Sequence, residues 1–157
     1  MKIAIASTRA GLRLKEHLKK FLIDGGYNVK DIGMQEGGEF VPYYESAANV
    51  ARGISTNQFD KGIIICGTGA GSVIVANKFP NVYAVHCANQ YEANKAAAVN
   101  GANVLVFGEW LTPNEHAVEI LKTWMTTKFG DGFAAEWVTF LQGAVTKIKE
   151  LETENFK

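Results

Sequence analysis

The segment of this 157-residue chain with the strongest chemical character is a cysteine followed by a glycine-rich run. Cys66 comes directly after three isoleucines, and the residues that follow it are Gly67-Thr68-Gly69-Ala70-Gly71. Residues 71–78 then have the pattern of a helix. The first N–H groups of a helix lack carbonyl partners and attract anions, and a thiol beside them ionises more readily than a free one. The segment therefore predicts a reactive thiol with its own anion hole.

A thiolate in this position could act as a general base that removes a proton from carbon, an effect worth about 10²–10⁴-fold in rate. Cys66 would then be the base, the amides of residues 67–71 would stabilise an oxyanion, and the Thr68 hydroxyl would assist. The alternative is that Cys66 is a small buried hydrophobic residue, the commoner role of a free cysteine. The Gly-x-Gly-x-Gly spacing fits neither a dinucleotide loop nor a Walker loop.

Other polar residues fall near the same predicted strand ends. Arg9 and Arg13 are two of only three arginines and lie four residues apart, so one helix face could present both to a phosphate or a carboxylate. A solvated helix face is the alternative for this pair. His86 could shuttle a proton, or it could be a hydrogen-bonded core histidine. Asn100 could bind a substrate hydroxyl or cap a helix, and aromatic residues within 41–44 could line a pocket or pack a helix start.

The elements that must position these residues alternate regularly between strand and helix. The pattern predicts strands at residues 2–7, 27–32, 60–66, 82–87 and 103–107, and helices at residues 12–25, 43–54, 71–78, 90–99 and from 112 onward, where Thr112-Pro113-Asn114-Glu115 has helix-capping chemistry. This alternation is typical of an α/β protein with a doubly wound, five-stranded parallel sheet in three layers. We expect a Rossmann-like sheet of order 2-1-3-4-5 with an extra C-terminal helix.

In such a sheet the switch point lies between the first and third strands, where ligands bind. Loops 7–11 and 66–72 then face each other across one crevice. We therefore expect the substrate-binding residues to be Ser7, Arg9, Gly67, Gly69, Gly71, Ser72, Asn100 and His86.

Composition limits the classes of function. A zero formal net charge argues against a general nucleic-acid or membrane binder, and no apolar run approaches the roughly 20 residues of a membrane helix. No secretory signal is evident and neither cysteine has zinc-type spacing, so we expect free thiols in the cytoplasm. We expect one domain, with residues 1–132 as its α/β part and 133–157 as a terminal helix. That helix has an apolar stripe that could pack on its own domain or cover a partner subunit.

These residues resemble the family of type B ribose 5-phosphate isomerases and galactose 6-phosphate isomerases. The resemblance covers residues 1 to about 132, and its motifs are Lys2-Ile3-Ala4-Ile5-Ala6-Ser7, residues 62–71, Ala76-Asn77-Lys78 and Asn100-Gly101-Ala102-Asn103-Val104-Leu105. It implies aldose–ketose isomerisation of a sugar phosphate without a metal or organic cofactor. It also implies a homodimer or a tetramer, with active sites between subunits. By this resemblance Cys66 moves a proton between C1 and C2 through an enediolate, residues 67–71 with Thr68 hold its oxygen, and Asn100 contacts substrate.

Three departures from the family pattern bear on the substrate. Thr8-Arg9 stands where Asp-His is usual, Val99 stands where a histidine opens the sugar ring, and residues 132–137 lack the arginines that bind phosphate. The hypothesis is therefore an isomerase whose substrate is a pentose 5-phosphate-like sugar phosphate held by Arg9, or an unphosphorylated or short open-chain sugar. A sugar-binding protein without turnover is the alternative. The hypothesis of a redox or acyl-transfer enzyme is weaker, because no resolving cysteine or paired histidine is evident.

Overall fold

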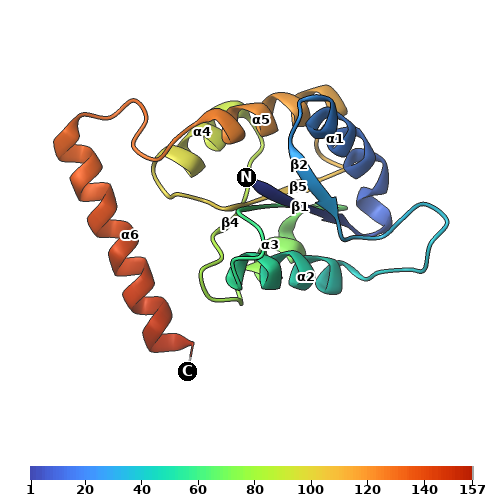
Figure 1. Ribbon diagram of the computed structural model, residues 1–157, viewed down its shortest axis with the longest axis horizontal. Helices are drawn as coiled ribbons and strands as arrows, with labels where there is room; N and C mark the ends of the chain where they lie inside the picture. Colours follow the sequence, from blue (N-terminus) through green and yellow to red (C-terminus); the bar gives the residue numbers. More distant parts are fainter. Residues whose placement is uncertain (157) are drawn as a thin grey trace.

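The computed structural model describes residues 1–156, which form a single parallel sheet with helices on both faces (Figure 1). The strands are β1 (Lys2–Ser7), β2 (Asn28–Asp31), β3 (Lys61–Cys66), β4 (Ala84–His86) and β5 (Val104–Gly108). The helices are α1 (Leu12–Asp24), α2 (Tyr43–Ser55), α3 (Ala70–Ala76), α4 (Gln90–Ala98), α5 (Asn114–Thr126) and α6 (Ala135–Asn155), and a short 3₁₀ turn, η1 (Arg9–Gly11), precedes α1. The predicted α/β class and the alternation of elements are confirmed.

Two apolar cores lie on opposite faces of the sheet, because successive strand residues point to opposite sides. Helices α1, α4 and α5 pack on the face that carries Ile3, Ile5, Ile63, Ile65, Leu105 and Phe107. Helices α2 and α3 cover the face that carries Ala4, Ala6, Ile64, Val104 and Val106 (Figure 1). Both faces of the central strands are therefore buried, as their continuous apolar sequences require.

The strand order is β2-β1-β3-β5-β4, so the expected order 2-1-3-4-5 is wrong in its last two positions. All five residues of β5 are buried, whereas β4 has three residues and two of them are only half-buried. A central parallel strand must be apolar on both faces, and β5 meets that condition better than β4 does. Strand β1 still lies between β2 and β3, so the predicted switch point is retained.

The start of α5 also differs from the expectation. The helix begins at Asn114, with Pro113 at the N-cap position and no side-chain hydrogen bond to the first turn. Thr112 is buried, and its N–H donates to the carbonyl of Gly108 at 3.0 Å in the turn that follows β5. The threonine therefore belongs to that turn and does not cap the helix.

A buried ionic cluster fixes α1 against the edge of the sheet. The side chain of Lys15 is fully buried, and its Nζ lies 2.8 Å from the carboxylate of Asp31, which also pairs with Lys19 at 2.8 Å. Burial alone would raise the pKa of Asp31, but hydrogen bonds from the two lysines outweigh it and hold that pKa below its usual value. All these charges are paired, so the cluster belongs to the scaffold.

Helix α6 stands apart from the layered body in Figure 1. Of its residues only Leu141 is buried, while Trp137, Phe140, Ile148 and Leu151 are exposed. Near its C-terminal end, Glu152 accepts hydrogen bonds from the Asn81 N–H at 2.6 Å and the Tyr83 hydroxyl at 3.4 Å. The apolar stripe expected from the sequence is thus largely uncovered in the single chain. None of the helices within residues 1–156 combines the length and the apolar character needed to cross a membrane.

Candidate active site

Cys66 lies at the carboxyl end of β3, at the switch point of the sheet. Its thiol sulfur accepts a hydrogen bond from the Gly69 N–H at 3.1 Å. Gly69 adopts a positive φ of 86°, which a glycine tolerates without strain, and this conformation turns the chain from β3 into α3. The loop thus returns its backbone toward the sulfur, and negative charge on that sulfur would be stabilised by the bond.

Each glycine of the Gly-x-Gly-x-Gly run lies under an aromatic ring. A Cβ atom at Gly67 would come within 2.9 Å of the Trp110 ring, and one at Gly71 would come within 2.6 Å of the Tyr43 ring. At Gly69 it would lie 2.6 Å from the imidazole of His86. The spacing of the glycines is therefore a packing requirement, because every alternate residue must let a ring approach the backbone.

The Cys66 loop opens into a cleft of about 770 Å³. Its lining is formed by Thr8, Arg9, Ala10, Phe40, Pro42, Tyr43, Tyr44, Cys66, Gly67, Thr68, Gly71 and Trp110. Four of these twelve residues are aromatic, and none of the twelve carries a carboxylate. Because the cleft carries one thiol and one guanidinium, it suits a small ligand with an anionic group.

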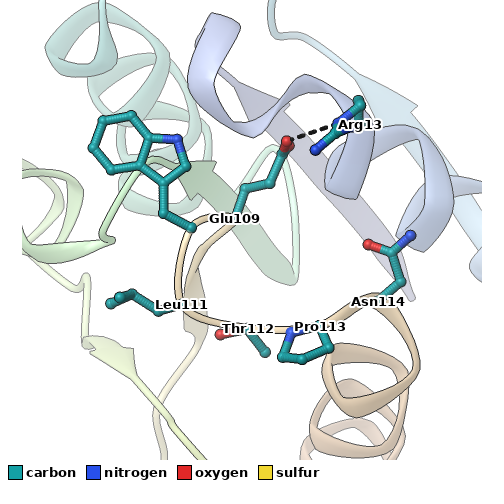
Figure 2. A pocket seen from close by; sticks show the side chains of 7 residues that line it. Arg13, Glu109, Leu111, Thr112, Pro113 and Asn114 are labelled. Carbon is teal, nitrogen blue, oxygen red and sulfur yellow. Dashed lines mark hydrogen bonds and ion pairs between the residues drawn. The ribbon is translucent and has the colours of Figure 1, made fainter.

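The two arginines expected on one helix face point into different pockets. Arg9 lies in η1 and lines the Cys66 cleft, with its guanidinium 5.7 Å from the centre of the Phe40 ring. Arg13 lies in α1 and lines a second pocket of about 400 Å³, where its Nε is 3.2 Å from a carboxylate oxygen of Glu109 (Figure 2). The expected pairing is wrong because the 3₁₀ turn changes the helical phase between the two residues.

Arg9 is the cation that remains available to a ligand in the cleft. Its side chain is exposed, and no carboxylate in residues 1–156 lies within ion-pair distance of it. Its guanidinium rests against an aromatic ring, which favours a cation without neutralising it. The geometry therefore leaves Arg9 free to pair with a substrate anion.

Several predicted site residues do not line the cleft. Ser7 and Ser72 are fully buried, and their hydroxyl oxygens have no hydrogen-bond partner within residues 1–156. His86 packs behind the loop against Gly69, and its Nε2 is likewise buried without a partner there. None of these three residues lines the cleft, so their contact with substrate stays a prediction.

Asn100 lies in a different place. It lines a pocket of about 440 Å³ together with Tyr83, Phe129 and residues of α6, among them Gln142 and Lys149. The single chain therefore does not bring Asn100 to Cys66. Contact of Asn100 with a substrate held at Cys66 stays a prediction.

Trp110 was not among the residues expected from the sequence. It follows β5 in the segment Gly108-Glu109-Trp110 and is 71% exposed, although its ring lies on Gly67. An aromatic residue two positions after an apolar parallel strand falls at the ligand-binding edge of the sheet, and that signal could have found it. Among residues 1–156, no group of three His, Cys, Asp or Glu side chains is placed to hold a metal ion.

The fold and the cleft define an α/β protein with a thiol and an unpaired arginine at the switch point of a parallel sheet. The sequence model of the family described as Ribose/Galactose Isomerase matches residues 3–139. The chain belongs to this family, which places it among the sugar isomerases, enzymes that interconvert aldoses and ketoses.

Individual relatives share about a third of their residues with this chain. It is 37% identical, over all of this chain and 99% of the relative, to a 4-deoxy-4-sulfo-D-erythrose isomerase of a Clostridium species. It is 33% identical to a D-erythrulose-4-phosphate isomerase of Pectobacterium atrosepticum, over 86% of this chain and 89% of that one. The structure of ribose-5-phosphate isomerase B from Clostridium thermocellum matches with a TM-score of 0.88 and 37% identity, over 98% of this chain and 99% of that one.

Proposed function

We propose that this chain isomerises a sugar by proton transfer between C1 and C2, with the Cys66 thiolate as the base. The sulfur takes the proton from C2 of the aldose, the electron pair of that C–H bond forms the C1–C2 double bond, and O1 becomes the oxyanion of an enediolate. Transfer of the O2 proton to O1 and return of the proton from the sulfur to C1 give the ketose. The observation that carries this proposal is the position of Cys66, which lines the cleft with its sulfur held by the Gly69 N–H.

The same loop supplies groups that would stabilise the enediolate oxygen. The first N–H groups of α3 have no carbonyl partner one turn earlier in the helix, and the Thr68 residue lines the cleft beside Cys66. Such donors act on charge that develops only during reaction, and removing one typically costs about 10²–10³-fold in rate. This arrangement supports the roles proposed for residues 67–71 and Thr68.

Arg9 is the residue proposed to bind the anionic end of the substrate. It is exposed in the cleft and unpaired by any carboxylate of residues 1–156, whereas Arg13 is already paired with Glu109. A guanidinium presents several N–H donors in one plane and therefore matches the oxygens of a phosphate or a sulfonate. The substrate would thus extend from Cys66, at its reacting carbons, to Arg9.

We further propose that the natural substrate is a four-carbon sugar that cannot close a ring. A sugar with a sulfonate in place of its C4 hydroxyl, or with that hydroxyl esterified, has no group with which to form a furanose. Such a substrate needs no ring-opening residue, and Val99 at that position cannot transfer a proton. The names of two relatives, a sulfo-erythrose isomerase and an erythrulose-phosphate isomerase, support the same substrate class.

A pentose 5-phosphate is the second candidate, favoured by the likeness to a solved ribose-5-phosphate isomerase B. The experiment that tests the proposal is to incubate the purified protein in D₂O with 4-deoxy-4-sulfo-D-erythrose, D-erythrose 4-phosphate and D-ribose 5-phosphate in turn. NMR then follows ketose formation and deuterium at the exchanging carbon. We expect the fastest turnover with a four-carbon sugar. Absence of both signals with all three sugars would contradict the proposed reaction and favour a sugar-binding protein.

We also propose that the active protein is a homodimer with shared sites. The exposed apolar residues of α6 suit a partner surface, and Asn100 cannot reach Cys66 within one chain. A two-fold dimer would place Asn100 of each copy at the cleft of the other. Changing Trp137 and Phe140 together to glutamate should convert the dimer to a monomer in analytical ultracentrifugation.

Mixing two inactive variants tests whether the sites are shared. Cys66→Ser and Asn100→Ala each remove one group from every site of a homodimer. In a mixed dimer one site keeps both wild-type residues, so about a quarter of the sites should become active after subunit exchange. No recovery of activity after verified exchange would show that each chain forms its site alone.

A further inference from the structure

Helix α3, which follows the glycine-rich loop, contacts the edge strand β4 at both of its ends. At its C-terminal end, the Asn77 side chain donates to the Ala84 carbonyl and accepts the Ala84 N–H, both at 2.9 Å. At its N-terminal end, Gly69 packs against the imidazole of His86, the last residue of β4. A helix of seven residues is unstable by itself, so contacts of this kind must hold α3 in place.

The glycine-rich loop passes over the end of β5 to reach β4, because β5 lies between β3 and β4 in the sheet. A Cβ at Gly108, the last residue of β5, would come within 2.6 Å of the Thr68 backbone. A Cβ at Gly69 would lie 2.6 Å from Cδ2 of the His86 ring and 3.4 Å from the carbonyl carbon of Phe107. Gly69 therefore lies against both the end of β5 and the imidazole.

Gly69 makes two hydrogen bonds that depend on its orientation. Its N–H donates to the Cys66 sulfur at 3.1 Å, and its carbonyl accepts the Val73 N–H at 3.1 Å in the first turn of α3. A glycine has no Cβ to restrict its backbone torsions, so it can leave the observed positive φ easily. The neighbours of Gly69 must therefore fix the direction of its N–H, and the His86 ring is one of them.

The His86 ring has no other function that the geometry shows. It is not among the residues that line the Cys66 cleft. Its Nε2 is buried and has no hydrogen-bond partner within residues 1–156, which lowers the stability of the fold. A ring with an unpaired buried nitrogen that packs on a loop residue fits a role in placing that residue.

We propose that His86 is a positioning residue whose ring holds the Gly69 N–H against the Cys66 sulfur. Without the ring, Gly69 gains room to rotate, and the thiolate loses a donor that stabilises its charge. Arg9, which alone carries a charge among the twelve residues that line the cleft, stays in place. For turnover this inference rests on the proposed function, but the effect on the sulfur can be measured without a substrate.

The test measures how the rate of Cys66 alkylation by iodoacetamide depends on pH, with peptide mass spectrometry to identify the labelled cysteine. For His86→Ala we expect the midpoint of this profile to rise by about one pH unit, because the ionised sulfur loses a hydrogen bond. With D-erythrose 4-phosphate, kcat should fall by about 10–10²-fold and KM should change less than about twofold, because the base is misplaced while Arg9 is unchanged.

Two control variants separate positioning from imidazole chemistry and from stability. His86→Phe keeps a flat ring and removes both ring nitrogens, so the midpoint and kcat should stay near those of the parent. Val85→Ala shortens the preceding side chain of β4, which packs on the opposite face of the sheet. It should lower the temperature of unfolding without moving the midpoint. A folded His86→Phe variant that behaves like His86→Ala would overturn the positioning role.

The outcomes also separate this inference from the proposed function. A parent-like midpoint in His86→Ala, in a protein that isomerises the sugar, would overturn the positioning role and leave the isomerase function intact. A raised midpoint in a protein that isomerises no sugar would support the positioning role and contradict the proposed function. An equal rise in Val85→Ala would show that lost stability alone changes the sulfur, and the inference would be wrong.

Discussion

The two cysteines lie at the same edge of the sheet and are both buried, but they have different neighbours. Cys66 ends β3, is 6% exposed, lines the cleft, and accepts the Gly69 N–H at its sulfur. Cys87 follows β4, is 1% exposed, and packs in the apolar core with alanines of α4. Burial, with a smaller contribution from Glu92, raises the pKa of the Cys87 thiol to about 11.

The difference teaches that proximity to the ligand-binding edge does not make a thiol reactive. At β3 the chain turns through Gly69 and directs the N–H of that residue to the sulfur. At β4 the chain enters α4 through Asn89, whose side chain accepts the Glu92 N–H, so the helix start is already capped. An uncapped start beside an open cleft is what distinguishes the candidate site from the scaffold.

The largest expected effect is on catalysis. Cys66→Ser should lower kcat/KM by about 10²–10⁴-fold, because a serine hydroxyl is a far poorer base than a thiolate. Cys87→Ser should stay within a few-fold of the parent, since Cys87 does not line the cleft. Ketose formation measured by NMR for both variants makes the comparison. Parent-like turnover by Cys66→Ser would exclude sulfur as the base.

The second effect is selective alkylation. Iodoacetamide at pH 8 should modify Cys66 at least about 10²-fold faster than Cys87, since only a minute fraction of a thiol with a pKa near 11 is ionised there. Labelling of Cys87 should rise only as the pH approaches 11. Peptide mass spectrometry gives the labelling rates of both cysteines, and loss of activity should follow the labelling of Cys66 alone. Equal labelling of the two cysteines at pH 8 would contradict the proposed difference in their reactivity.

Much of this contrast could be predicted from local sequence. The isoleucine run before Cys66 and the glycines after it specify a buried strand, a turn and a helix start, and the structure has all three. Arg9 was placed at the cleft by the same strand-end argument. Local patterns of apolarity and turn residues are sufficient for these features because each depends on neighbours in the chain.

Features that depend on distant segments were not predictable in this way. The order of β4 and β5 depends on which strand is apolar enough to lie beside β3. That strand is β5, whose residues Val104-Leu105-Val106-Phe107 are all buried. The ring of Trp110 reaches Gly67 only because β5 lies beside β3. The separation of Arg13 from Arg9 depends on a 3₁₀ turn and on Glu109, 96 residues away from Arg13.

A third test changes the loop that distinguishes Cys66. Gly69→Ala should lower kcat/KM by roughly tenfold or more, because a Cβ there meets His86 at 2.6 Å and displaces the N–H that contacts the sulfur. Gly132→Ala is the matched control, since Gly132 has a similar positive φ of 80° and no neighbour within 4 Å of its Cβ. In both variants an alanine at a positive φ lowers the free energy of unfolding by about 1 kcal/mol. A difference in activity between them therefore reports the change in the Cys66 loop. Equal activities would mean that the loop geometry does not matter to the sulfur.

The smallest expected effect is on stability. Here substitution of Cys87 should have the larger effect, whereas for activity substitution of Cys66 should. Cys87→Ser should lower the free energy of unfolding by about 1–3 kcal/mol, because it buries a hydroxyl among apolar side chains. Cys66→Ser should cost less than about 1 kcal/mol, because its hydroxyl faces the cleft and can accept the Gly69 N–H. Urea unfolding followed by circular dichroism measures both values. If Cys66→Ser proved the more destabilising change, the hydroxyl at position 66 would lack a partner at the cleft, and the proposed difference between the two cysteines would be wrong.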